Sequence, residues 1–191
     1  MTTVWMVRHG ETAWSLSGQH TGRTDIALTE RGRRQAKALA PLLSRQVFTR
    51  VLCSPLARAR ETCSLAGFGT RAIVEPDLVE WDYGIYEGRT TAEIRHEEKG
   101  WSLWTADVAG GENLDDLQQR SARFVRQLLT HNGTVLLFAH AHILRCIAGV
   151  WIDNHAALGE HFYLEAASIS VLDIRDDVRI ITKFNMTIYD R

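Results

Sequence analysis

The chain has 191 residues, of which 45% are hydrophobic and 24% are charged, and this composition excludes a disordered, fibrous or membrane-spanning chain. No apolar run approaches the ~20 residues that a membrane helix needs. Because the formal net charge is only -1, we expect no general attraction to nucleic acid or to a membrane surface, and any binding of anions has to be local.

Apolar runs with the length of strands alternate with helical patterns in the first half of the chain. Thr29 is the expected N-cap of the first helix, in which Pro41 predicts a kink. Gly67 ends the second helix. The predicted strands are residues 4–7, 51–53 and 72–79, and the predicted helices are residues 33–46 and 56–66.

The second half continues the alternation and ends differently. Its predicted elements are a partly helical stretch over 91–109, an amphipathic helix capped by Asn113, a strand over 134–140, a helix over 142–152 and a hairpin of 167–174 with 178–184. The nearly unbroken apolar run of residues 134–140 is typical of a parallel strand that is buried on both faces. We therefore predict an α/β fold, a three-layer α/β/α sandwich with a mostly parallel central sheet and an antiparallel edge strand, as a single domain over residues 1–191.

The cysteines give information about the environment of the protein. Cys53, Cys63 and Cys146 are odd in number and lack a C-x-x-C spacing, which argues against a disulfide framework and against a structural zinc site. Cys53 and Cys146 lie in apolar runs and are interpreted as small buried hydrophobic residues. Arg8 lies too close to the first residue for a signal peptide, so we expect a cytoplasmic protein.

Basic side chains follow three of the predicted strands. Arg8 and His9 come after the first strand, Arg58 follows the Ser54 turn, and His140 ends the strand of residues 134–140. Ligands of open α/β sheets bind beyond the carboxyl ends of the strands, where these side chains would converge. Basic groups that crowd together repel one another unless an anion joins them, and arginine matches phosphate oxygens bidentately. The pattern predicts a phosphate site.

A phosphate site alone does not require two histidines. A neutral imidazole can attack phosphorus and form a covalent intermediate, and we assign this role to His9. The arginines, and His140 if it is protonated, neutralise charge on the phosphoryl oxygens. The leaving group also needs a proton from a carboxyl group. Glu80, Asp82 and Glu87 in "EWDYGIYEG" are the candidates, and their spacing does not choose among them.

Six motifs between Val4 and about Gly149 occur in the order found in one known family. They are "RHGET", "TGRTDIALTERG", "SPLARARET", "EWDYGIYEG", "GGEN" and "AHAHILR". In these motifs the sequence resembles the histidine phosphatase superfamily, which includes cofactor-dependent phosphoglycerate mutase and fructose-2,6-bisphosphatase. The resemblance implies that His9 becomes the phosphohistidine, that Glu80 is the proton donor and acceptor, that no cofactor is used, and that the phosphoryl group is bound by Arg8, Arg58 and His140.

The resemblance also suggests substrate-binding positions. Ser15 stands where many members carry an asparagine that contacts phosphate, and Thr21 and Gly22 fall in the substrate loop. Ala141 replaces the usual glycine after the second histidine. We assign Tyr83 to the substrate site, and we expect at least half of the aromatic residues near the loops to seal the rim of the core; these are Trp14, Trp81, Tyr83, Tyr86, Trp101 and Trp104.

The remaining histidines do not indicate a metal site. His140 and His142 would point in different directions where a strand turns into a helix, and no Asp or Cys completes a ligand set. The others lie in polar stretches and are predicted to face solvent, with His20 near the mouth of the pocket; they are His20, His96, His131, His155 and His161.

Within the superfamily the motifs look closest to small phosphatases such as fungal sedoheptulose-1,7-bisphosphatase. The pair of arginines that helps phosphoglycerate mutases to hold their product is missing from residues 100–113. We therefore expect a metal-independent phosphomonoesterase that acts on small phosphorylated metabolites, such as sugar phosphates or bisphosphates. The alternatives are a phosphoglycerate mutase and a non-catalytic phosphopeptide-binding or regulatory module. The sequence leaves open the individual metabolite and the formation of a homodimer.

Overall fold

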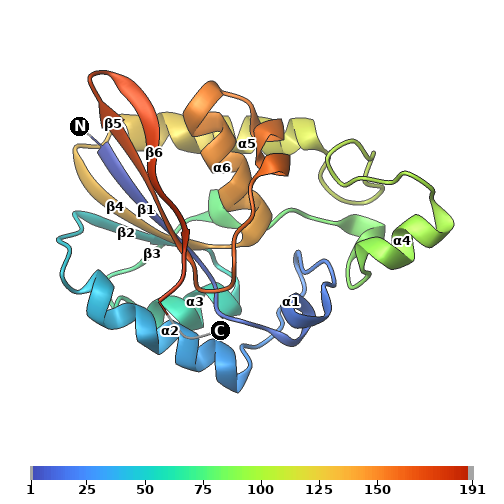
Figure 1. The fold of residues 1–191 in the computed structure, drawn as a ribbon, viewed down its shortest axis with the longest axis horizontal. Helices are drawn as coiled ribbons and strands as arrows, with labels where there is room; N and C mark the ends of the chain where they lie inside the picture. The colour runs from blue at the N-terminus through green and yellow to red at the C-terminus, as the bar shows by residue number, and fades with distance from the viewer. Residues whose placement is uncertain (1, 189–191) are drawn as a thin grey trace.

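A mixed sheet of six strands forms the centre of the computed structural model, which describes residues 2–188 (Figure 1). Its spatial order is β3-β2-β4-β1-β5-β6. The strands are β1 (Thr2–Arg8), β2 (Arg50–Cys53), β3 (Ile73–Val74), β4 (Gly133–Ala139), β5 (Ile169–Arg175) and β6 (Val178–Met186). The first four in chain order pair in parallel, whereas β5 is antiparallel to both β1 and β6. The predicted fold class is confirmed.

Helices cover both faces of this sheet. They are α1 (Ala13–Ser17), α2 (Glu30–Leu43), α3 (Ala57–Leu65), α4 (Thr91–Glu97), α5 (Leu114–Leu129) and α6 (Ala141–Asp153), with short 3-10 helices η1 (Pro76–Leu78), η2 (Gly84–Tyr86) and η3 (Ala156–His161). In Figure 1, α2 and α3 lie on one face of the sheet and α5 and α6 on the other. The small helices α1 and α4 lie beyond the end at which β1 stops.

The central strands bury side chains on both faces. In β4, Val135 and Leu137 belong to a core that packs against α5 and α6, whereas Leu136 and Phe138 belong to a second core against α2 and α3. All four side chains are fully buried. This alternation explains why the run of residues 134–140 is apolar without interruption, as predicted for a central parallel strand.

Local signals set several element boundaries. The Thr29 side chain caps α2 by accepting a hydrogen bond from the Gly32 N–H at 3.0 Å, as predicted, and Asn113 caps α5 in the same way. The prediction of an extended segment over 72–79 is wrong beyond Val74, because η1 begins at Pro76, which has no N–H for a sheet and a fixed φ angle.

The C-terminal hairpin also follows the sequence. Asp176 and Asp177 have φ angles of 48° and 62°, the left-handed backbone that a two-residue hairpin turn requires. The resulting β5–β6 pair covers the open edge of β1. None of the helices in residues 2–188 is long and apolar enough to span a membrane.

Candidate active site

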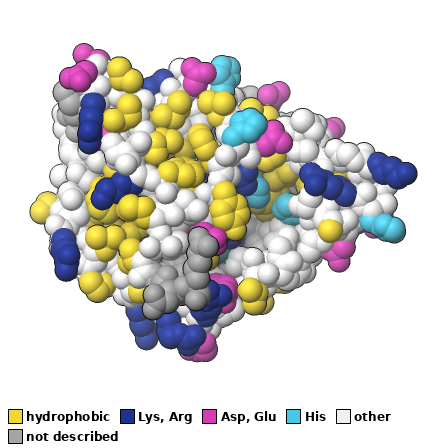
Figure 2. All heavy atoms as spheres, viewed as in Figure 1, with side chains coloured by type: hydrophobic (Ala, Val, Ile, Leu, Met, Phe, Trp, Pro, Cys, Tyr) yellow, Lys and Arg dark blue, Asp and Glu magenta, His cyan; other side chains and the backbone are white. Residues whose placement is uncertain are grey.

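A cavity of about 310 Å³ lies where β1 and β4 end, and we call it the main cavity. Seven predicted site residues line it: Arg8, His9, Ser15, Thr21, Glu80, Tyr83 and Ala141. Figure 2 shows the surface hollowed on this side of the molecule, with histidine and hydrophobic side chains gathered there. The structure therefore brings together residues that are up to 133 positions apart, from Arg8 to Ala141.

His9 follows β1 directly and has a defined tautomer. Its Nδ1 lies 2.7 Å from the Gly10 carbonyl oxygen, and because a carbonyl only accepts, Nδ1 carries the proton. The unprotonated Nε2 is then the atom that can act as a nucleophile. Burial, together with the nearby Arg8 and Arg58 guanidinium groups, holds the pKa of His9 well below its ordinary value. The imidazole is neutral at neutral pH, as the predicted role requires.

The glycine after His9 is needed for close packing. A Cβ on Gly10 would lie 2.4 Å from the carbonyl oxygen of Gly32, in the first turn of α2. No side chain fits there, so the chain leaving β1 passes directly over the backbone of α2. This contact fixes the peptide whose carbonyl orients the His9 ring.

His140 lies beneath His9 and is held on both ring nitrogens. The two ring centroids are 5.2 Å apart. Arg58 Nε donates to His140 Nδ1 at 3.1 Å, so the proton of the neutral ring lies on Nε2 and is donated to Ser54 Oγ at 2.7 Å. Burial, followed by the charge of Arg58, holds the pKa of His140 well below its ordinary value.

The guanidinium of Arg58 binds backbone carbonyls of the loop before α2. It donates to the carbonyl oxygens of Thr21, Gly22 and Thr24 at 3.0, 2.8 and 2.9 Å. Gly22 is buried behind the wall of the main cavity, as are Arg58 and His140. Binding of phosphate by Arg58 therefore requires exchange of carbonyl contacts for phosphate oxygens, and its role stays a prediction.

These contacts correct the argument that four basic groups need an anion to coexist. Both imidazoles are neutral because burial disfavours their charged forms, and the charge of Arg58 is bound by carbonyl dipoles. Arg8 differs from Arg58. One of its terminal nitrogens donates to the Leu164 carbonyl at 2.5 Å, whereas its buried Nε lacks a hydrogen-bond partner among the described residues. Arg8 also lines the main cavity, so its guanidinium is placed to bind an oxyanion there.

Glu80 is the acidic residue that lines the main cavity, and backbone N–H groups hold it in place. Oε1 accepts from Trp81 and Ile143, each at 2.9 Å, and Oε2 accepts from His142 at 3.0 Å. Two of these donors belong to the first turn of α6, so the start of this helix fixes the orientation of the carboxyl group. The side chain is thus fixed in the same cavity as His9.

The other two candidate acids point elsewhere. Asp82 Oδ2 pairs with the Nε of Arg23 at 3.2 Å, outside the lining of the main cavity. Glu87 accepts from the N–H groups of Gly22 and Thr24 at 2.9 and 3.0 Å. Glu87 therefore fixes the loop that binds Arg58, and the placement favours Glu80 for the acid role.

Two of the predicted substrate positions belong to helix ends. The Ser15 hydroxyl accepts from the Thr12 N–H at 2.8 Å and donates to the Thr12 carbonyl at 3.0 Å, in the capping box of α1. A phosphate contact would have to compete with these bonds. Ala141 is the first residue of α6 and lines the main cavity with its methyl group.

Sequence reasoning missed seven residues of the main cavity, namely Gly18, Gln19, Thr91, His142, Arg145, Tyr163 and Leu164. The predicted place of His20 near the pocket is confirmed, because it lines the main cavity. The prediction that it faces solvent is wrong: the ring is half-buried against Tyr83, and burial lowers its pKa to about 4. A signal for His142 and Arg145 was present, because residues three apart in the helix after His140 share a face.

The aromatic residues near the loops mostly seal the core, as expected. Trp81, Tyr83, Tyr86, Trp101 and Trp104 are all buried. Tyr83 both lines the main cavity and lies with its hydroxyl 2.7 Å from Nδ1 of His142. Burial raises the pKa of Tyr83 well above its ordinary value, so it stays a neutral phenol.

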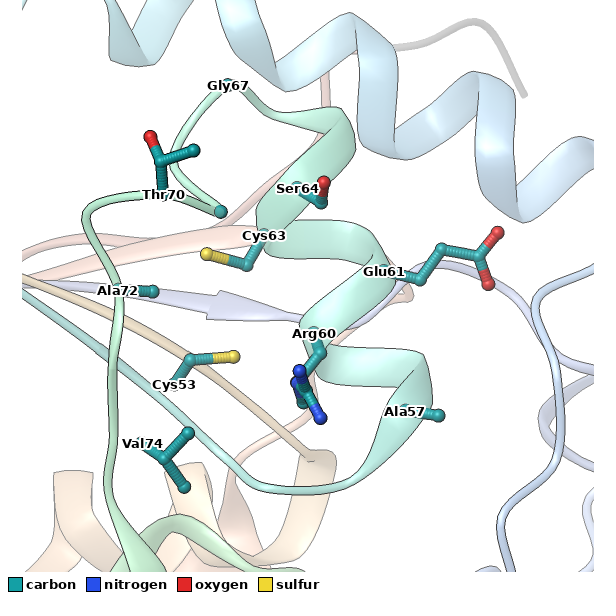
Figure 3. Close-up of a pocket in the computed structure, with 11 residues that line it drawn as sticks. Cys53, Ala57, Arg60, Glu61, Cys63, Ser64, Gly67, Thr70, Ala72 and Val74 are labelled. Atoms are coloured by element: carbon teal, nitrogen blue, oxygen red, sulfur yellow. The ribbon is translucent and has the colours of Figure 1, made fainter.

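A separate cavity of about 530 Å³ lies between α3 and β3 (Figure 3). It contains none of the predicted site residues. Cys53 and Cys63 line it as free, buried thiols, and the neighbouring Cys63 thiol together with burial raises the pKa of Cys53. Within residues 2–188, no three His, Cys, Asp or Glu side chains are grouped so as to hold a metal ion.

The buried histidines predict a loss of stability in mild acid. Burial lowers the pKa values of His9, His20, His140 and His142 in the folded protein, whereas the unfolded chain titrates near 6.5. Below that pH the unfolded state binds more protons, so the free energy of unfolding falls by ~1.4 kcal/mol per pH unit for each extra proton. We expect urea midpoints that drop from pH 7.5 to 5.5.

A substitution separates the contribution of His20 to this pH dependence from the contributions of other titrating groups. His20→Asn should reduce the pH slope of the urea midpoint, because it removes one group whose pKa is about 4 in the folded state. His96→Asn on exposed α4 is the matched control and should leave the slope unchanged. A midpoint that is constant from pH 7.5 to 5.5 in the wild-type protein would contradict the assignment of neutral, buried rings.

Comparison with known proteins gives one consistent result. Residues 4–187 match the sequence profile of the histidine phosphatase superfamily (branch 1). An acid phosphatase of Mycobacterium tuberculosis is 37% identical over 186 residues, which cover 95% of this chain and 91% of the relative. The sedoheptulose 1,7-bisphosphatase of Saccharomyces cerevisiae is 32% identical over 178 residues, which cover 76% of this chain and 66% of the relative.

A solved structure shows the same architecture. The product of an open reading frame of Mycobacterium tuberculosis superposes with a TM-score of 0.92 at 36% sequence identity. The match covers 97% of this chain and 98% of that chain. The likeness therefore extends over both the sheet and the loops that form the main cavity.

Proposed function

The chain belongs to the histidine phosphatase superfamily (branch 1), whose phosphatases act on phosphorylated small molecules, and we propose that it is a metal-independent phosphomonoesterase that works through a phosphohistidine on His9. One observation carries this proposal. Nδ1 of His9 is bound to the Gly10 carbonyl, so the lone pair of Nε2 is available in a cavity that also contains Arg8 and Glu80.

In the first step His9 takes the phosphoryl group. The Nε2 lone pair attacks phosphorus, the N–P bond forms and the P–O bond to the leaving group breaks. Glu80, in its protonated form, gives its proton to the leaving oxygen, which departs as an alcohol. The guanidinium of Arg8, which lines the main cavity, binds a phosphoryl oxygen and stabilises the charge that is spread over the oxygens.

In the second step water releases the phosphate. Glu80, now a carboxylate, accepts a proton from the water whose oxygen attacks phosphorus, and the N–P bond breaks. Inorganic phosphate leaves, His9 returns to its neutral form, and Glu80 is again protonated for the next cycle. The fixed position of Glu80 at the start of α6 supports both transfers.

The names of the relatives support a small phosphorylated substrate. One relative is an acid phosphatase and another a sedoheptulose 1,7-bisphosphatase, which is consistent with sugar phosphates or bisphosphates as the class. We propose that residues 1–191 act as one catalytic domain in the cytoplasm, without nucleic-acid or membrane partners.

Phosphate release from a panel of phosphorylated metabolites tests the proposal. We expect stoichiometric inorganic phosphate, with rates unchanged by EDTA, because the proposed steps use protein groups only. 3-Phosphoglycerate is included to test the mutase alternative. Conversion of it to 2-phosphoglycerate without free phosphate would overturn the assignment as a phosphatase, and stable binding without turnover of any ester would favour a non-catalytic module.

A further inference from the structure

Arg145 lies on α6 one turn beyond His142 and faces two adjoining cavities. It lines the main cavity and also a smaller one of about 280 Å³, which is walled by Trp101 and Trp104. Both cavities share His20, Thr91, His142 and Arg145, so they adjoin each other, and His9 lines only the first of them. A leaving group attached to a phosphate at His9 would extend toward Arg145.

The guanidinium of Arg145 is held in a fixed position. Its Nε donates to the Gly159 carbonyl at 2.8 Å and one terminal nitrogen donates to the Glu160 carbonyl at 3.0 Å. The group lies over the Trp104 ring, 4.9 Å from its centroid. The carbonyls and the aromatic face orient the cation in advance, which lowers the entropic cost of binding a ligand.

This cation has no carboxylate partner among residues 2–188, because none of the ion pairs there includes Arg145. Glu160 lines the smaller cavity but offers Arg145 its backbone carbonyl. By contrast, the buried Arg120 pairs with Glu112 at 2.8 Å. Carbonyl oxygens bind part of this charge, as they do for Arg58, but the Arg145 guanidinium lines two cavities, where an anion can approach it.

We propose that Arg145 is a specificity-determining residue that binds a second anionic group, a phosphate or a carboxylate, on the leaving-group side of the substrate. The preferred substrates are then phosphate monoesters that carry another compact anion. This inference rests on the proposed function of the main cavity and adds the substrate class to it.

Matched substrates that differ in one charge test the proposal. Glycerol 3-phosphate is compared with 3-phosphoglycerate and glycerol 1,3-bisphosphate, and fructose 1-phosphate with fructose 1,6-bisphosphate as a longer pair. We expect kcat/KM to be about 10- to 100-fold higher for the anionic member of at least one pair, as for a hydrogen-bonded ion pair. The comparison of 3-phosphoglycerate with the bisphosphates distinguishes carboxylate from phosphate as the second group.

The variant Arg145→Gln should abolish this preference, mainly through KM, because the contact is present in both the bound substrate and the transition state. Arg145→Lys should retain part of it. Arg126→Gln, an exposed charge on α5, is the matched control and should keep the full preference. The ratio of two substrates in one preparation does not depend on the fraction that is folded.

Two failures can be told apart with p-nitrophenyl phosphate, whose leaving group lacks a second anion. If this ester is hydrolysed but neither pair shows a preference, or if Arg145→Gln lowers both members of a pair equally, the role of Arg145 is wrong and the phosphatase assignment stands. If no ester releases phosphate, the proposed function itself is wrong.

Discussion

Replacement of His9 by alanine is expected to lower kcat by about four to six orders of magnitude, the size of loss seen when a covalent nucleophile is removed. His140 cannot take over this role, because both of its ring nitrogens are bound, by Arg58 and Ser54. The variant should also lose the acid-labile, base-stable label that [³²P]-phosphorylated substrate leaves on the wild-type protein.

Rapid quench followed by peptide mapping measures this label directly. The wild-type label should map to His9 and appear within one turnover. The matched control is His155→Ala, an exposed histidine outside the main cavity, which should keep both label and turnover. If His9→Ala still releases phosphate at the wild-type rate, or if the label maps to another residue, the phosphohistidine mechanism is wrong.

The fold could be predicted from the sequence where the apolar or capping pattern of a segment matches the environment of that segment in the folded structure. Residues 134–140 are apolar throughout because successive side chains of this central strand point alternately into the two cores. Thr29 marks the start of a helix because its hydroxyl accepts from the Gly32 N–H, which has no carbonyl partner within the helix. Helix α1 escaped prediction, since its five residues are stabilised by the Thr12 capping box and have no buried side chain. Periodicity contains no signal for such an element.

The location of the site could be predicted from the sequence because several of its residues follow the ends of predicted strands. Arg8, His9 and Glu80 meet in the main cavity as expected. The charge states were not predictable, because the neutrality of His140 depends on how deeply the fold buries it. The positions of His20 and Arg145 depend likewise on contacts with distant segments, such as the Glu160 carbonyl that holds Arg145. Spacing along the chain does not encode those contacts.

Replacement of Glu80 by glutamine is expected to separate substrates by their leaving groups. Alkyl phosphates such as glycerol 3-phosphate need a proton on the departing oxygen, so kcat should fall about 10²- to 10⁴-fold. p-Nitrophenolate leaves without protonation, so the first step with p-nitrophenyl phosphate should change by less than about 10-fold. The burst of p-nitrophenol in stopped flow measures that step apart from hydrolysis of the intermediate.

The comparison of two substrates separates chemistry from structural damage. The His142 N–H donates to one oxygen of Glu80 and the Ile143 N–H to the other. Glutamine has only one oxygen, so its NH2 group would face one of these N–H groups, and any resulting distortion of α6 would slow both substrates alike. Asp82→Asn tests the neighbouring acid, which pairs with Arg23 outside the main cavity, and should leave the leaving-group dependence intact. Equal losses on both esters in Glu80→Gln, or a selective loss in Asp82→Asn, would move the proton transfer away from Glu80. The structure favours the first assignment, because the carboxylate of Glu80 alone among the three candidate acids lies in the cavity that contains the His9 imidazole.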